Sequence, residues 1–60
     1  MKDKIKAARI AAGLSQKALA DKAGTTKQTV SNIETGRHDP ELATIKKVCA
    51  ALDIDWRDLV

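Results

Sequence analysis

The sequence predicts an all-α fold, in which short helices form a single domain over residues 1–60. No window alternates between polar and apolar residues with the period of a strand. Gly13, Gly24, Gly36 and Pro40 instead divide the chain into segments of helical length. Within most of these segments the apolar residues recur every three or four positions, which is the spacing of one helix face.

The first predicted helix covers residues 2–12, which are rich in the good helix formers Ala, Lys and Arg. Ile5, Ala8 and Ala12 would share one face of this helix and point to the core. Gly13 follows directly and suits the left-handed residue that ends many helices. We therefore expect the first turn of the chain at this glycine.

Two polar residues mark the starts of the next two helices. Ser15 is a good N-cap for a second helix over 16–23, because its hydroxyl can accept a backbone N–H from the first turn. Thr26 can do the same for a third helix over 27–35, which Gly36 ends. The second and third helices are thus separated by a turn of only three residues.

A fourth helix is predicted over 41–52 and a short fifth helix over 56–60, capped by Asp55. The fourth helix carries a core-facing stripe of apolar residues, namely Leu42, Ile45, Val48, Cys49 and Leu52. This placement makes Cys49 a core residue, whereas Lys46 and Lys47 would form a solvated face. Trp56 has two open roles, an intramolecular lid on the core or a contact between two copies of the chain.

The spacing of small and apolar residues over 15–36 predicts a helix-turn-helix. Two helices that cross steeply need a small side chain where they touch, and Ala20 supplies it. The corner needs a residue that tolerates positive φ, which is Gly24. Val30 and Ile33 supply the apolar inner side of the second of these helices. A plain helical hairpin is the alternative, but it does not explain the polar outer face described next.

The outer face of the third helix is uncharged and rich in amides. On a helical wheel Gln28 and Asn32 lie almost opposite the stripe of Val30 and Ile33. Their amides can bond adenine N6 and N7 together, and Lys27 can bond guanine O6 or N7. Solvated surface positions are the alternative role for both amides, and the surrounding motif favours base contact.

The charge and cysteine content limit the classes of function. The net charge is +3, with 11 basic and 8 acidic residues, and the basic excess lies in the first forty residues. Such an excess suits a polyanionic partner such as double-stranded DNA. A single cysteine excludes an internal disulfide, and we expect a cytoplasmic protein without a membrane span or signal peptide.

The sequence also resembles the Cro and phage-repressor type (XRE) of helix-turn-helix domain over nearly its whole length. The resemblance rests on Arg9-Ile10-Ala11-Ala12-Gly13-Leu14-Ser15-Gln16, Leu19-Ala20, Gly24-Thr25-Thr26, Val30-Ser31-Asn32-Ile33-Glu34-Thr35-Gly36, Pro40 and Ala51-Leu52. It implies a compact five-helix, lambda-repressor-like domain of a transcriptional regulator, with the helix 27–35 in the major groove. It also implies a homodimer on a palindromic site as the common arrangement.

The resemblance further implies roles for single residues. It pairs Arg9 with Glu34, and it places Gln16 against a phosphate or an outer base. The base-reading positions fall on Lys27, Gln28, Thr29 and Asn32. The residues expected at the DNA backbone are Ser15, Gln16, Thr26, Thr35, Arg37 and His38, of which His38 is equally compatible with a plain loop position.

A protein-interaction module, such as the antitoxin of a toxin–antitoxin pair, is the alternative function, because the family also contains partner-binding members. An enzyme is not expected, since the sequence has no paired acids, no nucleophile with a base and no phosphate-binding loop. One His and one Cys cannot form a zinc site. We therefore expect no catalytic residue, metal, cofactor or small-molecule ligand.

Overall fold

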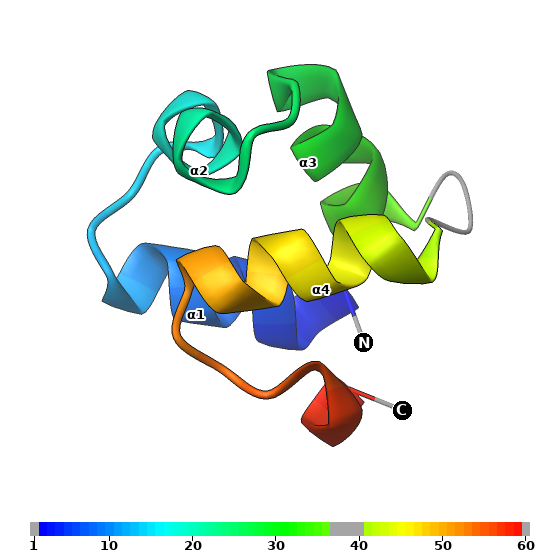
Figure 1. The fold of residues 1–60 in the computed structure, drawn as a ribbon. Helices are drawn as coiled ribbons and strands as arrows, with labels where there is room; N and C mark the ends of the chain where they lie inside the picture. Colours follow the sequence, from blue (N-terminus) through cyan, green and yellow to red (C-terminus); the bar gives the residue numbers. More distant parts are fainter. Residues whose placement is uncertain (1, 37–40, 60) are drawn as a thin grey trace.

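The computed structural model describes residues 2–36 and 41–59, and within them it contains helices and no strand. The helices are α1 (Lys2–Ala11), α2 (Gln16–Ala23), α3 (Lys27–Thr35) and α4 (Leu42–Ala51), followed by the 3-10 helix η1 (Trp56–Leu59). In Figure 1, α2 and α3 lie on one side of the domain, and α1 and α4 lie on the other. The predicted all-helical class is confirmed, and the predicted fifth helix is a 3-10 helix of four residues.

The ends of α2 and α3 are fixed by the residues that the sequence indicated. The Ser15 hydroxyl accepts the Ala18 N–H at 3.0 Å, and the Thr26 hydroxyl accepts the Thr29 N–H at 3.1 Å. Gly24, with a φ of 72°, ends α2 in the left-handed conformation, which glycine adopts without a steric penalty. These caps satisfy backbone groups that the helix itself cannot pair, so they fix where each helix begins and ends.

One apolar cluster holds the helices together. α2 packs against α3 and α4, and α1 packs against α3. The buried residues of this core are Ile5, Leu19, Ala20, Val30, Ile33, Ile45, Val48, Cys49, Ala51 and Leu52. Every helix from α1 to α4 therefore contributes to the same core, which fixes the position of α3 relative to the rest of the domain.

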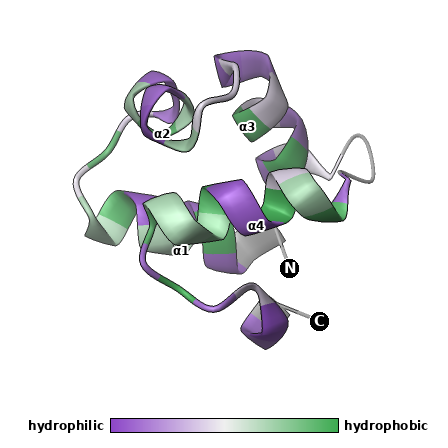
Figure 2. Ribbon diagram, viewed as in Figure 1, coloured by the Kyte–Doolittle hydropathy of each residue, from purple (hydrophilic) through white to green (hydrophobic). Residues whose placement is uncertain are grey.

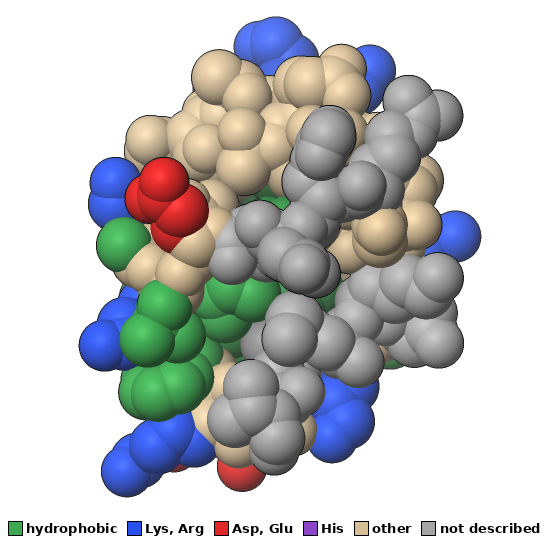
Figure 3. Space-filling view, turned by 90° about the vertical axis from the view of Figure 1, so that its right-hand side faces the viewer, with side chains coloured by type: hydrophobic (Ala, Val, Ile, Leu, Met, Phe, Trp, Pro, Cys, Tyr) green, Lys and Arg blue, Asp and Glu red, His purple; other side chains and the backbone are tan. Residues whose placement is uncertain are grey.

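Two residues that the sequence pattern assigned to the core lie on the surface. Leu42 is 51% exposed, because it begins α4 at the edge of the domain, one turn before the helix meets the other elements. Ala12 is exposed because α1 ends at Ala11, so Ala12 belongs to the turn and not to the helix face. Figure 3 views the side that carries the first turn of α4, where hydrophobic side chains reach the surface among charged ones.

The segment after α4 folds back onto the domain. Trp56 is half-buried and packs against the core, and the Lys46 ammonium lies 4.9 Å from the centroid of its ring. The Asp55 carboxylate accepts the Arg57 N–H at 2.9 Å, which caps η1. Lys4 on α1 donates to the Asp58 carbonyl oxygen at 2.8 Å. Of the two roles that the sequence left open for Trp56, these contacts favour the intramolecular lid.

Cys49 is 1% exposed on the inner side of α4, as its place on the apolar stripe predicted. Burial raises the pKa of the thiol, and the nearby Asp55 charge acts in the same direction. We expect a thiol reagent at pH 8 to modify the native protein at least about a hundredfold more slowly than the unfolded protein, since reaction requires opening of the core. Equal rates with and without guanidinium would contradict this burial.

Candidate nucleic-acid interface

The α2–α3 pair has the geometry of a helix-turn-helix. Ala20 is almost completely buried in the core, consistent with the small side chain that a close crossing of two helices requires. The chain turns at Gly24, where the Thr25 N–H donates to the Ala20 carbonyl oxygen at 2.9 Å. The two helices are thus held by their core contacts and by the hydrogen bonds of the turn, so they form a rigid unit.

α3 exposes the face that the helical wheel placed outward. Val30 and Ile33 are buried in the core, whereas Gln28 is exposed and Asn32 is half-buried on the other side. Figure 2 shows that the first turn of α3 is hydrophilic on the outside of the domain. The core therefore holds α3 by its inner face and leaves its amide-bearing face free for a ligand.

Gln28 and Asn32 form a hydrogen bond with each other across one turn of α3. The Gln28 Nε2 donates to Asn32 Oδ1 at 2.9 Å. Residues four apart on a helix are neighbours, so this bond is compatible with an undistorted helix. The two side chains present one connected amide surface, a feature that the helical wheel could not show.

The other expected base readers lie in the first turn of α3. Lys27 is exposed and has no ion-pair partner among the residues that the structure describes. The hydroxyls of Thr29 and Thr26 lie 2.9 Å apart, so the Thr29 hydroxyl is already engaged by the cap of the helix. The Lys27 ammonium is therefore available to a ligand at the start of α3, and Thr29 beside it is half-buried.

The starts of α2 and α3 carry no acidic side chain in their first turns. The N-terminal end of a helix carries a partial positive charge and backbone N–H groups that attract anions. Lys17, Lys22 and Lys27 are all exposed on these two helices, and Asp21 faces Lys17 at 3.6 Å in an exposed ion pair. This side of the molecule is thus suited to a polyanion such as a phosphate backbone.

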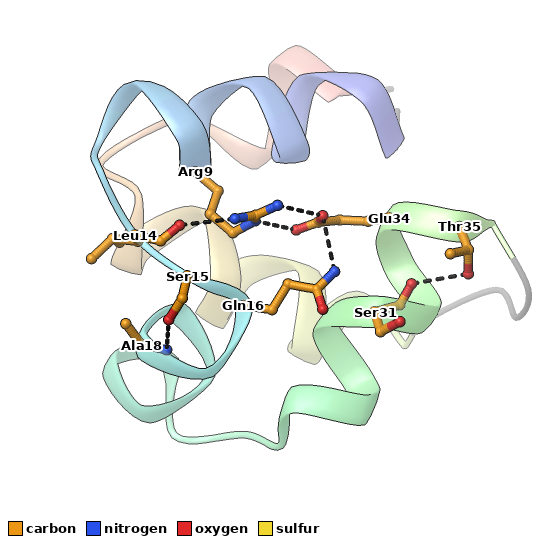
Figure 4. A network of polar contacts seen from close by, with 8 residues as sticks. All are labelled: Arg9, Leu14, Ser15, Gln16, Ala18, Ser31, Glu34 and Thr35. Atoms are coloured by element: carbon orange, nitrogen blue, oxygen red, sulfur yellow. Dashed lines mark hydrogen bonds and ion pairs between the residues drawn. The ribbon is translucent and has the colours of Figure 1, made fainter.

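Arg9 and Glu34 form an ion pair that joins α1 to the end of α3 (Figure 4). Arg9 Nε donates to Glu34 Oε2 at 2.7 Å and its second guanidinium nitrogen donates to Oε1 at 3.1 Å. A third donor of Arg9 reaches the Leu14 carbonyl oxygen at 2.8 Å. The bond to Glu34 raises the pKa of Arg9 above its usual value, so the guanidinium remains charged.

Gln16 belongs to the same network. Its Nε2 donates to Glu34 Oε1 at 3.3 Å, and Figure 4 shows it at the start of α2, pointing toward the end of α3. Sequence reasoning assigned Gln16 to the DNA backbone and missed this bond. The local sequence gives no signal for this bond, because the turn joins the end of α2 to the start of α3, whereas Gln16 opens α2 and Glu34 closes α3.

Of the other residues expected at the DNA backbone, the structure describes three and leaves two outside the described residues. The Thr35 hydroxyl donates to the Ser31 carbonyl oxygen at 2.9 Å within α3. Ser15 and Thr26 use their hydroxyl oxygens as helix caps, as described above. Arg37 and His38 lie outside the described residues.

In residues 2–36 and 41–59, no three His, Cys, Asp or Glu side chains lie close enough together to bind a metal ion. Among the same residues, every helix is too short or too polar to span a bilayer.

Proteins with similar sequences bear the name of uncharacterized transcriptional regulators, and one with a similar structure is a restriction-modification controller protein. The helix-turn-helix family profile matches residues 5–59. The HTH-type transcriptional regulator YgzD of Bacillus subtilis is 39% identical over 59 residues, which cover 98% of this chain and 89% of the relative. The HTH-type transcriptional regulator MJ0272 of Methanocaldococcus jannaschii is 36% identical with the same coverage.

A solved structure has the same fold. The restriction-modification controller protein C.AhdI from Aeromonas hydrophila superimposes with a TM-score of 0.91 and is 36% identical in sequence. The match covers 98% of this chain and 89% of the controller protein. The profile match and the two relatives agree with this superposition, and the chain therefore belongs to the helix-turn-helix family.

Proposed function

We propose that this chain is a transcriptional regulator that binds double-stranded DNA at a specific sequence, with α3 in the major groove. The observation that carries the proposal is the outward face of α3, where Gln28 and Asn32 stand opposite the buried Val30 and Ile33. Amide side chains on a protruding helix can read base edges, and an α-helix fits the width of the major groove. The family consists of DNA-binding regulator domains and not of enzymes.

The proposed base contacts come from the start of α3. Gln28 and Asn32 offer amide donors and acceptors to base edges, and Lys27 offers its ammonium to guanine O6 or N7. Thr29 stands beside them in the first two turns, which reach furthest into the groove. These four residues would give the protein its preference for one sequence over another.

The proposed contacts to the DNA backbone come from the ends of the helices. The residues that we assign to this role are Ser15, Gln16, Thr26, Thr35, Arg37 and His38. The starts of α2 and α3 support the assignment, since both lack acidic side chains that would repel a phosphate. Gln16 has one further amide N–H, so it can bond a phosphate oxygen while it bonds Glu34.

We also propose that two copies of the chain bind a palindromic site. A recognition helix of nine residues can read only one short half-site, and repressors of this shape use a two-fold axis to read two half-sites one helical turn apart. Sedimentation of the complex with a selected duplex should give two chains per duplex. One chain per duplex at saturation would contradict the dimer without affecting the contacts of α3.

The experiment that tests the proposed function is selection of bound duplexes from a random DNA pool, followed by titration of the selected duplex and a scrambled one. Enrichment of one sequence is the expected result. Enrichment of no sequence would contradict the proposal. Binding to a protein partner more tightly than to any duplex would favour the protein-interaction function instead.

Two substitutions should separate base reading from backbone contact. Gln28→Ala should weaken binding to the selected duplex by about tenfold to a hundredfold, since it removes one amide–base contact, and it should leave binding to the scrambled duplex nearly unchanged. Arg37→Ala should weaken binding to both duplexes alike and reduce the slope of log affinity against log salt by about one. Equal losses on both duplexes for Gln28→Ala would contradict its role as a base reader.

A further inference from the structure

The hydrogen bond between Gln28 and Asn32 determines which groups of Gln28 remain free. A glutamine amide has two N–H donors and one carbonyl acceptor. One donor of Gln28 is used by Asn32 Oδ1 at 2.9 Å. Gln28 therefore presents one N–H and its Oε1 to anything that approaches α3.

These free groups match one purine better than the other. Adenine shows an N6 donor and an N7 acceptor in the major groove, which need one acceptor and one donor from the protein. Guanine shows two acceptors, N7 and O6, which a glutamine can bond together only with both of its N–H groups. A glutamine that has already given one N–H away is therefore complementary to adenine and incomplete for guanine.

We propose that Asn32 is a positioning residue that makes Gln28 select adenine over guanine. The inference rests on the proposed function, because it assigns a preference within the same DNA-reading surface. Asn32 acts here through its carbonyl oxygen, which holds the amide of Gln28 in one orientation. Its own Nδ2 hydrogens remain available for an acceptor on a neighbouring base or phosphate.

The position of the pair allows the bond to persist on DNA. Gln28 is exposed and Asn32 half-buried in the free protein, where water weakens such a bond. A groove that excludes water strengthens hydrogen bonds between the groups it covers. The caps at Thr26 and Gly36 fix the helical backbone between them, so the four-residue spacing that the bond needs is maintained.

The test uses the selected duplex and measures binding at one base pair. The base pair to use is the one at which Gln28→Ala most reduces the preference of the protein for one base. Four duplexes are made that differ only at this base pair. For the unaltered protein we expect the adenine duplex to bind about tenfold or more tightly than the guanine duplex. Asn32→Ala should reduce this ratio by about fivefold, because Gln28 regains both N–H groups and a free orientation.

The Asn32→Asp variant tests whether the oxygen that accepts the bond from Gln28 is sufficient for the preference, without the amide nitrogen of Asn32. The carboxylate keeps the acceptor for Gln28, so the ratio of adenine to guanine affinity should stay within about twofold of the original. Its negative charge should lower the affinity for all four duplexes alike through repulsion of phosphates. The combined variant with Gln28→Ala and Asn32→Ala should show the same ratio as Gln28→Ala alone, since residues that act as a unit are not additive.

Ser31→Ala is the matched control, because Ser31 is a polar neighbour on the same helix whose side chain makes no hydrogen bond in the described part of the chain. It should leave the ratio unchanged, and melting temperatures should show that all variants are folded. An unchanged ratio in Asn32→Ala would overturn the inference, and so would a combined variant in which the effects of the two single substitutions multiply. In either case the selected duplex would still support the proposed function. Failure to select any duplex would overturn both.

Discussion

Replacement of Leu19 by alanine is expected to lower the free energy of unfolding by about 2–5 kcal/mol. Leu19 is 0% exposed and lies on α2, the helix that packs against both α3 and α4. Removal of its side chain leaves a cavity that three helices would have to close. A domain of this length has about 3–9 kcal/mol of stability in total, so a large share of the Leu19→Ala molecules should be unfolded near body temperature.

Chemical denaturation followed by circular dichroism measures this loss, and Leu42→Ala is its matched control. Leu42 begins α4 and is 51% exposed, so the same change there should cost less than about 1 kcal/mol. DNA affinity should fall in Leu19→Ala in proportion to the unfolded fraction, and it should be unchanged in Leu42→Ala. A similar loss of stability in both variants would show that Leu42 is covered in solution.

The two leucines also show what a sequence pattern can and cannot predict about this core. Both are apolar residues of predicted helices, and hydropathy alone gives them the same weight. A stripe shows which face of a helix is turned inward, but it does not show how far along the helix the neighbouring elements reach. Leu42 lies in the first turn of α4, beyond that reach, and its exposure depends on the arrangement of helices in space.

The helix ends were more predictable because their causes are local. Ser15 and Thr26 bond backbone N–H groups three residues further on, and Gly24 and Gly36 adopt positive φ values that residues other than glycine seldom adopt. Such contacts depend on a few consecutive residues and are therefore visible in a sequence. The 3-10 form of η1 was not predicted, since in a segment of four residues the final geometry depends on its contacts with the domain.

For the candidate interface too, the sequence predicted one part and not another. The outward placement of Gln28 and Asn32 follows from the helical period, and the structure agrees with it. The helical period did not predict the hydrogen bonds between side chains, namely the one between Gln28 and Asn32 and the one from Gln16 to Glu34. Both depend on side-chain rotamers, which the helical period does not determine. The bond from Gln16 to Glu34 also requires that α2 and α3 be packed, since it joins two helices.

Replacement of Glu34 by glutamine is expected to lower the free energy of unfolding by about 3 kcal/mol. The Glu34 side chain is 3% exposed and that of Arg9 is 13% exposed, so water can stabilise neither charge effectively. The substitution preserves the size of the side chain and removes only its charge. The guanidinium of Arg9 would then remain in a poorly solvated position without a carboxylate.

Glu41→Gln provides the matched control, because Glu41 is exposed and its side chain makes no capping bond at the start of α4. Denaturation midpoints of the two variants should differ clearly, with Glu41→Gln within about 0.5 kcal/mol of the original protein. Equal midpoints would mean that the ion pair contributes no more than a surface pair does.

A double variant shows whether the pair stabilises the fold or only avoids an unpaired charge. Replacement of both Arg9 and Glu34 by methionine removes both charges and keeps most of the volume, and such changes at buried pairs are often neutral. We therefore expect the double variant to regain much of the stability that Glu34→Gln loses. It should still bind the selected duplex less tightly, because Gln16 loses its partner on Glu34 and the start of α2 is no longer tied to the end of α3.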